Sequence, residues 1–114
     1  MLEEIINKAK QEKYIDFLFG IDEYDKIIEE LDTEKELLNQ EMVDRKTFMD
    51  IISIYKTKIE NLYFIRMEQY GYADEDAVVY RISFTNDLDN LLEECKEYMK
   101  NNDFIKTRKT FDTH

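Results

Sequence analysis

Residues 62–84 carry the pattern that most constrains how this chain can fold. Two runs, 62–70 and 77–84, are rich in aromatic and β-branched residues, and side-chain character alternates along each run with a period of two. Such alternation is typical of strands and does not fit the 3.6-residue period of a helix. Between the runs, glycine, tyrosine, alanine and acids form a segment of turn-type composition. The sequence therefore predicts a β-hairpin whose loop is longer than two residues.

The residues before this hairpin show helical spacing instead. Apolar side chains recur at intervals of three and four over 2–9, and again over 21–61. The crowded apolar residues 14–19 fit either a last helical turn or a short strand. We expect an N-terminal helix, followed by two or three further helices with breaks near Asp32 and Asp44.

After the hairpin, residues 86–100 show the clearest amphipathic helix pattern in the chain. Residues 85–87 offer side chains that can cap its start, and Lys100 suits the negative end of the helix dipole. The following residues, 103–111, are locally basic. They are predicted to form a third strand or part of a disordered tail.

These patterns predict an α+β fold in a single domain, 1–114. Its elements are N-terminal helices, a central β-hairpin at about 62–84, an amphipathic helix at about 86–100, and a third strand or partly disordered tail at 103–114. The alternative is an all-α fold in which 44–70 is one long helix.

Charge restricts the partners of such a domain. The formal net charge is −11, while hydrophobic residues make up 43% of the chain, enough for a core. This charge repels nucleic acid phosphates and anionic membranes, and it favours a protein partner with a basic surface. Acids at the N-terminus do not fit a secretory signal, and no apolar run approaches the ~20 residues that span a bilayer. We therefore expect a cytoplasmic location.

Catalysis by histidine or by a metal finds little support in the residues. His114 is the only histidine and ends the chain, so triad chemistry and zinc binding both lack a positioned imidazole. Cys95, the only cysteine, falls on the apolar stripe of the helix at 86–100 and is predicted to be buried. The acids Asp74 and Asp76 do not have the spacing of a calcium loop.

Two further motifs of enzymes are also not met. The chain contains two glycines, too few for a glycine-rich phosphate loop. Asp87, Glu94 and Lys96 superficially match a pattern of metal-dependent nucleases, but Glu94 and Lys96 should face apart on a helix. We therefore expect no catalytic, cofactor or metal site, and a protein that is not an enzyme.

What remains is the acidic surface. The first fifty residues contain fifteen acids against seven lysines and arginines. A row of carboxylates on one helix face can imitate the anionic track of a nucleic acid, which carries about one charge per 1.7 Å. Tyrosines and acids at the hairpin tip add a second contact surface. The predicted partner-binding residues are Asp22, Asp25, Glu29, Asp32 and Glu36 on the helix, and Tyr70, Tyr72, Asp74, Glu75 and Asp76 at the tip.

The expected function is that of a non-enzymatic protein-binding module that covers a basic, nucleic-acid-binding surface of its partner. The composition, which is acidic, tyrosine-rich and without proline, is similar to that of many small phage and plasmid products, some of which inhibit host or defence proteins. The alternative is a small structural or assembly subunit that acts as a homo-oligomer through its apolar stripes and hairpin edge.

Overall fold

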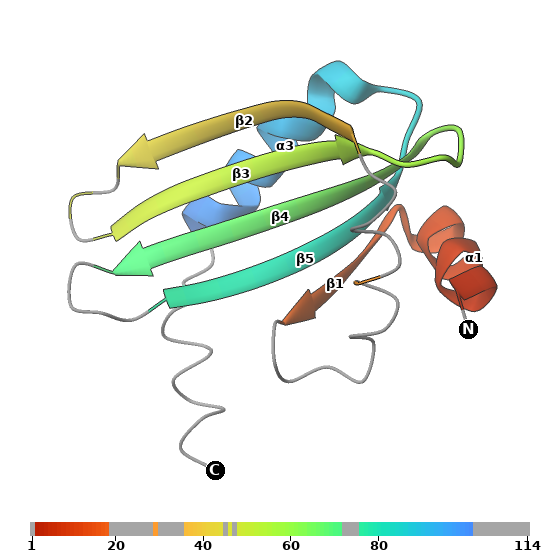
Figure 1. Ribbon diagram of the computed structural model, residues 1–114, viewed down its shortest axis with the longest axis horizontal. Helices are drawn as coiled ribbons and strands as arrows, with labels where there is room; N and C mark the ends of the chain where they lie inside the picture. Colours follow the sequence, from red (N-terminus) through yellow and green to blue (C-terminus); the bar gives the residue numbers. More distant parts are fainter. Residues whose placement is uncertain are drawn as a thin grey trace, which may run out of the picture.

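The computed structural model describes residues 2–18, 29, 36–44, 46, 48–71 and 76–101. Within these ranges, five strands form one antiparallel sheet in the order β1-β5-β4-β3-β2 (Figure 1). Strands β2 to β5 follow one another as a meander, and β1 pairs with the free side of β5. The elements in chain order are α1 (Leu2–Glu12), β1 (Tyr14–Leu18), β2 (Glu36–Asp44), β3 (Phe48–Lys56), β4 (Leu62–Gly71), β5 (Asp76–Phe84) and α3 (Leu88–Asn101).

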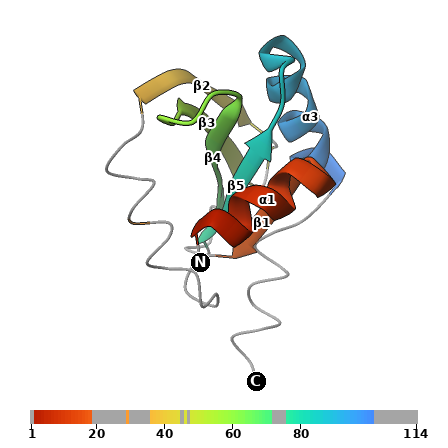
Figure 2. The same ribbon diagram turned by 90° about the vertical axis from the view of Figure 1, so that its right-hand side faces the viewer.

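Both faces of the sheet are packed against a helix. Successive residues of a strand point to opposite faces, so Phe64 packs toward α1 while Ile65 packs toward α3. Figure 2 shows α3 along one side of the sheet and α1 beside β1 and β5. The α1 side buries Ile5, Ala9, Phe17, Leu62, Phe64, Tyr80 and Ile82, and the α3 side buries Ile52, Ile54, Ile65, Met67, Val79, Leu91, Cys95 and Met99.

The helices predicted between residues 21 and 61 are wrong for the described part of that segment, and so is the all-α alternative. Residues 36–44 and 48–56 are the strands β2 and β3. The spacing misleads because β3 contacts the core through Ile52 and Ile54, while its other face carries Ile51 and Tyr55. A strand with apolar residues on both faces loses the alternation that marks a strand, and three- and four-residue intervals arise by chance.

The predicted hairpin exists but is only part of a larger sheet. Strands β4 and β5 pair in antiparallel register from Leu62↔Phe84 to Tyr70↔Asp76, with β3 and β1 on their outer sides. The ambiguous residues at 14–18 are the strand β1, which pairs with β5. The strand or tail expected at 103–114 lies outside the described residues.

The helix predicted at 86–100 is present as α3. Asp87 caps it, because its Oδ1 accepts a hydrogen bond from the backbone N–H of Asn90 at 3.2 Å. Leu91, Cys95 and Met99 lie one helical turn apart on its buried face. A helix with one apolar face keeps its sequence period, and for this reason its prediction succeeded.

Candidate functional site

Strand β2 is an outer strand of the sheet, and its side chains are unusually exposed. Leu37, Leu38 and Met42 are 51%, 41% and 61% exposed, although they are large apolar residues. Three acids share the strand, and they are Glu36, Glu41 and Asp44. An outer strand that presents both apolar and acidic side chains has the composition of surfaces through which proteins contact one another.

A bulge divides this strand. The pairing with β3 shifts register between Leu37 and Asn39, so Leu38 has no direct partner on β3. From Asn39 to Asp44 the pairing is regular. The regular stretch of β2 is therefore six residues long, with Leu38 displaced at one end of it.

A groove of about 220 Å³ lies between β2 and the start of α3. Its walls are mostly apolar, and two of them, Leu38 and Leu88, are partly exposed at 41% and 38%. Asp89 adds a carboxylate at the rim. The groove is lined by Leu38, Asn39, Ile54, Leu88, Asp89 and Leu92. Its size suits one medium-sized apolar side chain, not a typical small-molecule ligand.

An ion pair holds α3 beside β2. Lys96 Nζ lies 2.8 Å from Glu41 Oε1 and 3.4 Å from Glu93 Oε1. The hydrogen bond from Lys96 to Glu41 raises the pKa of the lysine. Helix α3 lines the groove and also contacts β2 through Lys96. The groove and the outer strand therefore form one continuous surface.

The predicted helix row of acids is only partly described. Glu29 and Glu36 are exposed, but Glu36 begins β2 and so does not belong to a helix. The remaining members of this row, Asp22, Asp25 and Asp32, lie outside the described residues. The partner-binding role of these acids stays a prediction. Among them, Glu36 lies on the outer strand β2.

The hairpin-tip prediction is tested by the structure even less. Tyr70 is the next-to-last residue of β4 and is half-buried, with its hydroxyl donating a hydrogen bond to Glu68. Asp76 begins β5. Tyr72, Asp74 and Glu75 lie outside the described residues.

The most buried basic side chain of the described chain is that of Arg81, on the α3 side of β5. Its side chain is 2% exposed and lies between the rings of Tyr14 and Tyr98, 3.7 and 4.5 Å from their centroids. Asp16 accepts two hydrogen bonds from it, at 2.7 and 3.0 Å. Burial opposes the charge of Arg81, but the hydrogen bond and charge of Asp16 prevail and raise its pKa. The bidentate, stacked geometry makes this a structural ion pair.

Two protonated groups adjoin this ion pair. Burial raises the pKa of the Cys95 thiol to about 11, although Arg81 acts in the opposite direction. Burial and the charge of Asp16 raise the pKa of Tyr98 to about 12. A reactive thiol needs a lowered pKa and access to solvent. Cys95 has neither, and the prediction that it is a buried core residue is confirmed.

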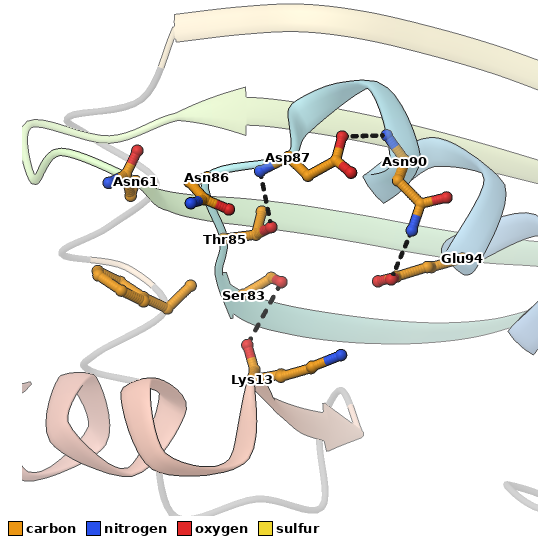
Figure 3. A pocket seen from close by; sticks show the side chains of 9 residues that line it. Lys13, Asn61, Ser83, Thr85, Asn86, Asp87, Asn90 and Glu94 are labelled. Carbon is orange, nitrogen blue, oxygen red and sulfur yellow. Dashed lines mark hydrogen bonds between the residues drawn. The ribbon is translucent and has the colours of Figure 1, made fainter.

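A polar cleft of about 420 Å³ lies where β5 meets α3 (Figure 3). Lys13 stands on one side, and Asp87, Asn90 and Glu94 stand on the other. Asp87 caps the helix, and Glu94 accepts a hydrogen bond from the Asn90 side chain at 2.9 Å. Ser83 Oγ donates to the carbonyl of Lys13. Because these contacts stabilise the start of α3 and the α1–β1 turn, we interpret the cleft as a structural junction.

The nuclease-like triplet does not converge. Glu94 lines the cleft, whereas Lys96 binds Glu41 on the neighbouring strand. Within the residues that the structure describes, no three potential ligands from histidine, cysteine, aspartate and glutamate are grouped to hold a metal.

Comparison with protein families, with curated proteins and with solved structures finds no match for this chain in any of the three. Across the described ranges, no helix combines the length and apolar character needed to cross a bilayer. The site is therefore interpreted from its own geometry, and that geometry defines a small α+β protein with an exposed outer strand.

Sequence reasoning missed the apolar part of this site. Leu38 and Met42 fall in the segment 21–61, whose spacing predicts helices, and Leu88 falls in the amphipathic helix predicted at 86–100. The sequence contains no clear signal for it, because adjacent apolar residues such as Leu37 and Leu38 also occur in strands that are buried on both faces.

Proposed function

We propose that this protein is a non-enzymatic binding module for another protein that carries a basic surface. The observation that supports it is the outer strand β2, which exposes Leu37, Leu38 and Met42 beside three acids. Apolar side chains supply contact energy on burial, and carboxylates select and attract a cationic partner.

The overall charge of the chain agrees with this partner. With a formal net charge of −11, long-range attraction accelerates association with a basic protein and opposes contact with anionic ones. A partner whose basic residues hold nucleic acid would be blocked by this module, which is then an inhibitor acting by occlusion. Salt should weaken such a complex, because much of the attraction is screened over about 10 Å at 0.1 M.

Affinity capture with two matched variants tests this function. Glu36→Lys with Met42→Lys changes β2 by three charges, and Glu3→Lys with Gln11→Lys changes the exposed surface of α1 by the same amount. A nuclease-treated bacterial lysate is passed over each bait, eluted in salt steps and identified by mass spectrometry. We expect a basic protein on the wild-type and α1-variant baits, and at least tenfold less of it on the β2 variant.

Added duplex DNA separates mimicry from simple charge attraction. If the module covers a nucleic-acid-binding surface, DNA displaces the captured protein from the bait. Retention of no basic protein by the wild-type bait, or equal loss on both variants, would contradict the proposed function.

Self-association is a second candidate, and the same exposed strand favours it. Leu37, Leu38 and Met42 on two chains would bury each other in a homodimer. Light scattering discriminates the two functions, because the chain mass is 13.9 kDa and a dimer doubles it. The acids of β2 favour the basic partner, since a dimer would oppose like charges along the paired strands.

A further inference from the structure

The edge of β2 offers backbone groups as well as side chains. An antiparallel strand uses alternate residues to bond its neighbour, so an outer strand directs the remaining N–H and C=O groups away from the sheet. In the described part of the chain, β2 pairs with β3 on one side and with no strand on the other. Six residues of regular strand, Asn39–Asp44, span about 20 Å at ~3.3 Å each. This length matches a typical added strand.

The bulge determines where an added strand can lie. It interrupts the regular edge at Leu38, so strand addition is confined to Asn39–Asp44. Beside that interruption lies the 220 Å³ groove lined by Leu38, Leu88 and Leu92. Strand addition generally takes its affinity from main-chain hydrogen bonds and its specificity from pockets for side chains. In this protein, the outward backbone groups of β2 and the groove for a side chain lie next to each other.

The charges along the strand indicate what kind of segment fits. Asn39, Glu41 and Val43 pair with residues on the α3 face of β3, whereas Gln40, Met42 and Asp44 pair with residues on the α1 face. Each face therefore carries one carboxylate. An added strand would meet both acids with one basic residue on each of its faces, an odd number of positions apart, and the basic residue near Glu41 would share that carboxylate with Lys96. A second copy of this chain would instead place Glu41 and Asp44 of both strands along one ladder, which like-charge repulsion disfavours.

We propose that β2 binds an extended basic segment of the partner protein by strand addition along Asn39–Asp44. One apolar side chain of that segment enters the groove between Leu38 and Leu88. This inference rests on the proposed function, since it specifies how the basic partner is held. It predicts that the partner contributes a short stretch with two lysine or arginine residues an odd number of positions apart and one leucine-sized residue at one end.

Peptide display on the full chain tests the inference. A random library of twelve-residue peptides is selected on the wild-type protein, and the recovered sequences are synthesised. We expect two basic residues an odd number of positions apart, together with one apolar anchor. Leu88→Asp should weaken the synthetic peptide at least tenfold, because the substitution places a charge in the groove. Leu88 is the first residue of α3 and is 38% exposed, and an acid at that position suits the helix dipole, so the fold should survive.

The matched control is Asn7→Asp. Asn7 is exposed on α1, and it belongs neither to β2 nor to the residues that line the groove. Peptide affinity should stay within about twofold of wild type. Hydrogen exchange supplies the second readout, and peptide binding should slow exchange of the outward amides of Asn39–Asp44 at least tenfold.

Each outcome separates the inference from the function on which it rests. If basic peptides bind but neither Leu88→Asp nor β2 exchange responds, the basic-partner function stands and strand addition is wrong. Recovery of peptides without basic residues contradicts both. If the outward amides of β2 are already protected in the free protein, another segment of this chain or a second copy occupies the edge, and strand addition by a partner is again wrong.

Discussion

At the scale of single residues, the buried guanidinium of Arg81 has a direct consequence for stability. It is 2% exposed, and the described structure offsets its charge through Asp16, whose side chain is 22% exposed. Taking a charge out of water is costly unless a partner compensates it. The two tyrosine rings that enclose Arg81 strengthen the pair by excluding water and by contacting the cation.

Removal of one member of this pair should therefore lower the free energy of unfolding more than removal of both. Asp16→Ala is expected to lower the free energy of unfolding by about 3 kcal/mol, because it leaves an uncompensated buried charge. Adding Arg81→Met should recover at least half of this loss, since methionine fills the space between the rings without a charge. Urea denaturation of the two variants measures both values. Simple additivity of the two substitutions would show that the pair is not coupled.

The raised pKa of Cys95 makes stability depend on alkaline pH. The thiol ionises at its ordinary value of 9.0 when unfolded and at about 11 when folded, so the folded state retains its proton longer. This contribution is complete below pH 9 and is lost as pH rises toward 11. A shift of this size corresponds to roughly 2 kcal/mol by pH 11.

Comparison with Cys95→Ala isolates this effect from other alkaline titrations. The free energy of unfolding is measured in urea at pH 8 and at pH 10.5 for both proteins. We expect the wild type to lose more stability over this interval than the variant does. The raised pKa of Tyr98 acts in the same direction at higher pH and is common to both proteins. Equal losses would mean that Cys95 ionises in the folded protein as readily as in the unfolded chain.

At the scale of elements, the connection between α3 and β2 controls the outer strand. Apart from its ladder with β3, the described contacts of β2 with the rest of the fold include the Lys96–Glu41 pair and the walls of the groove. Exposed ion pairs add little to overall stability, but they can restrain a locally opening element.

Lys96→Ala should therefore loosen β2 without unfolding the protein. We expect amide exchange in β2 to accelerate about threefold to tenfold, while exchange in β4 stays unchanged because that strand is central. Hydrogen exchange followed by NMR resolves the two strands. Lys100→Ala, on the exposed end of the same helix, is the control. If β4 accelerates along with β2, the sheet opens as one unit, and the ion pair has no local role.

How well each element was predicted depends on how its faces are covered. Helix α3 buries one face, and its period survives in the sequence. Strand β3 contacts the core through Ile52 and Ile54 and also carries Ile51 and Tyr55 on its other face, so its alternation disappears. The two central strands β4 and β5 kept enough alternation to be recognised. Local periodicity could not show that a third and a fourth strand would flank them.

At the scale of the whole molecule, the sequence predicted the character of the surface but not its geometry. The negative charge follows from counting residues, and Glu36, one of the acids predicted to bind a partner, is exposed on β2. The groove could not be foreseen, because it joins Leu38 to Leu88, fifty positions further along the chain. Contacts over such separations are set by the order of strands in the sheet, which a single sequence does not display.

The pairing of β1 with β5 also has a consequence for synthesis of the chain. Asp16 leaves the ribosome 65 residues before Arg81, its partner. At about 5 to 20 residues per second, it waits roughly 3 to 13 s. During this time the apolar side of α1 and β1 has no sheet to cover it, while each hairpin of the meander can close as soon as it emerges. The segment that forms α1 and β1 is therefore completed late although it is translated before the meander, and it stays accessible to chaperones and proteases during that interval.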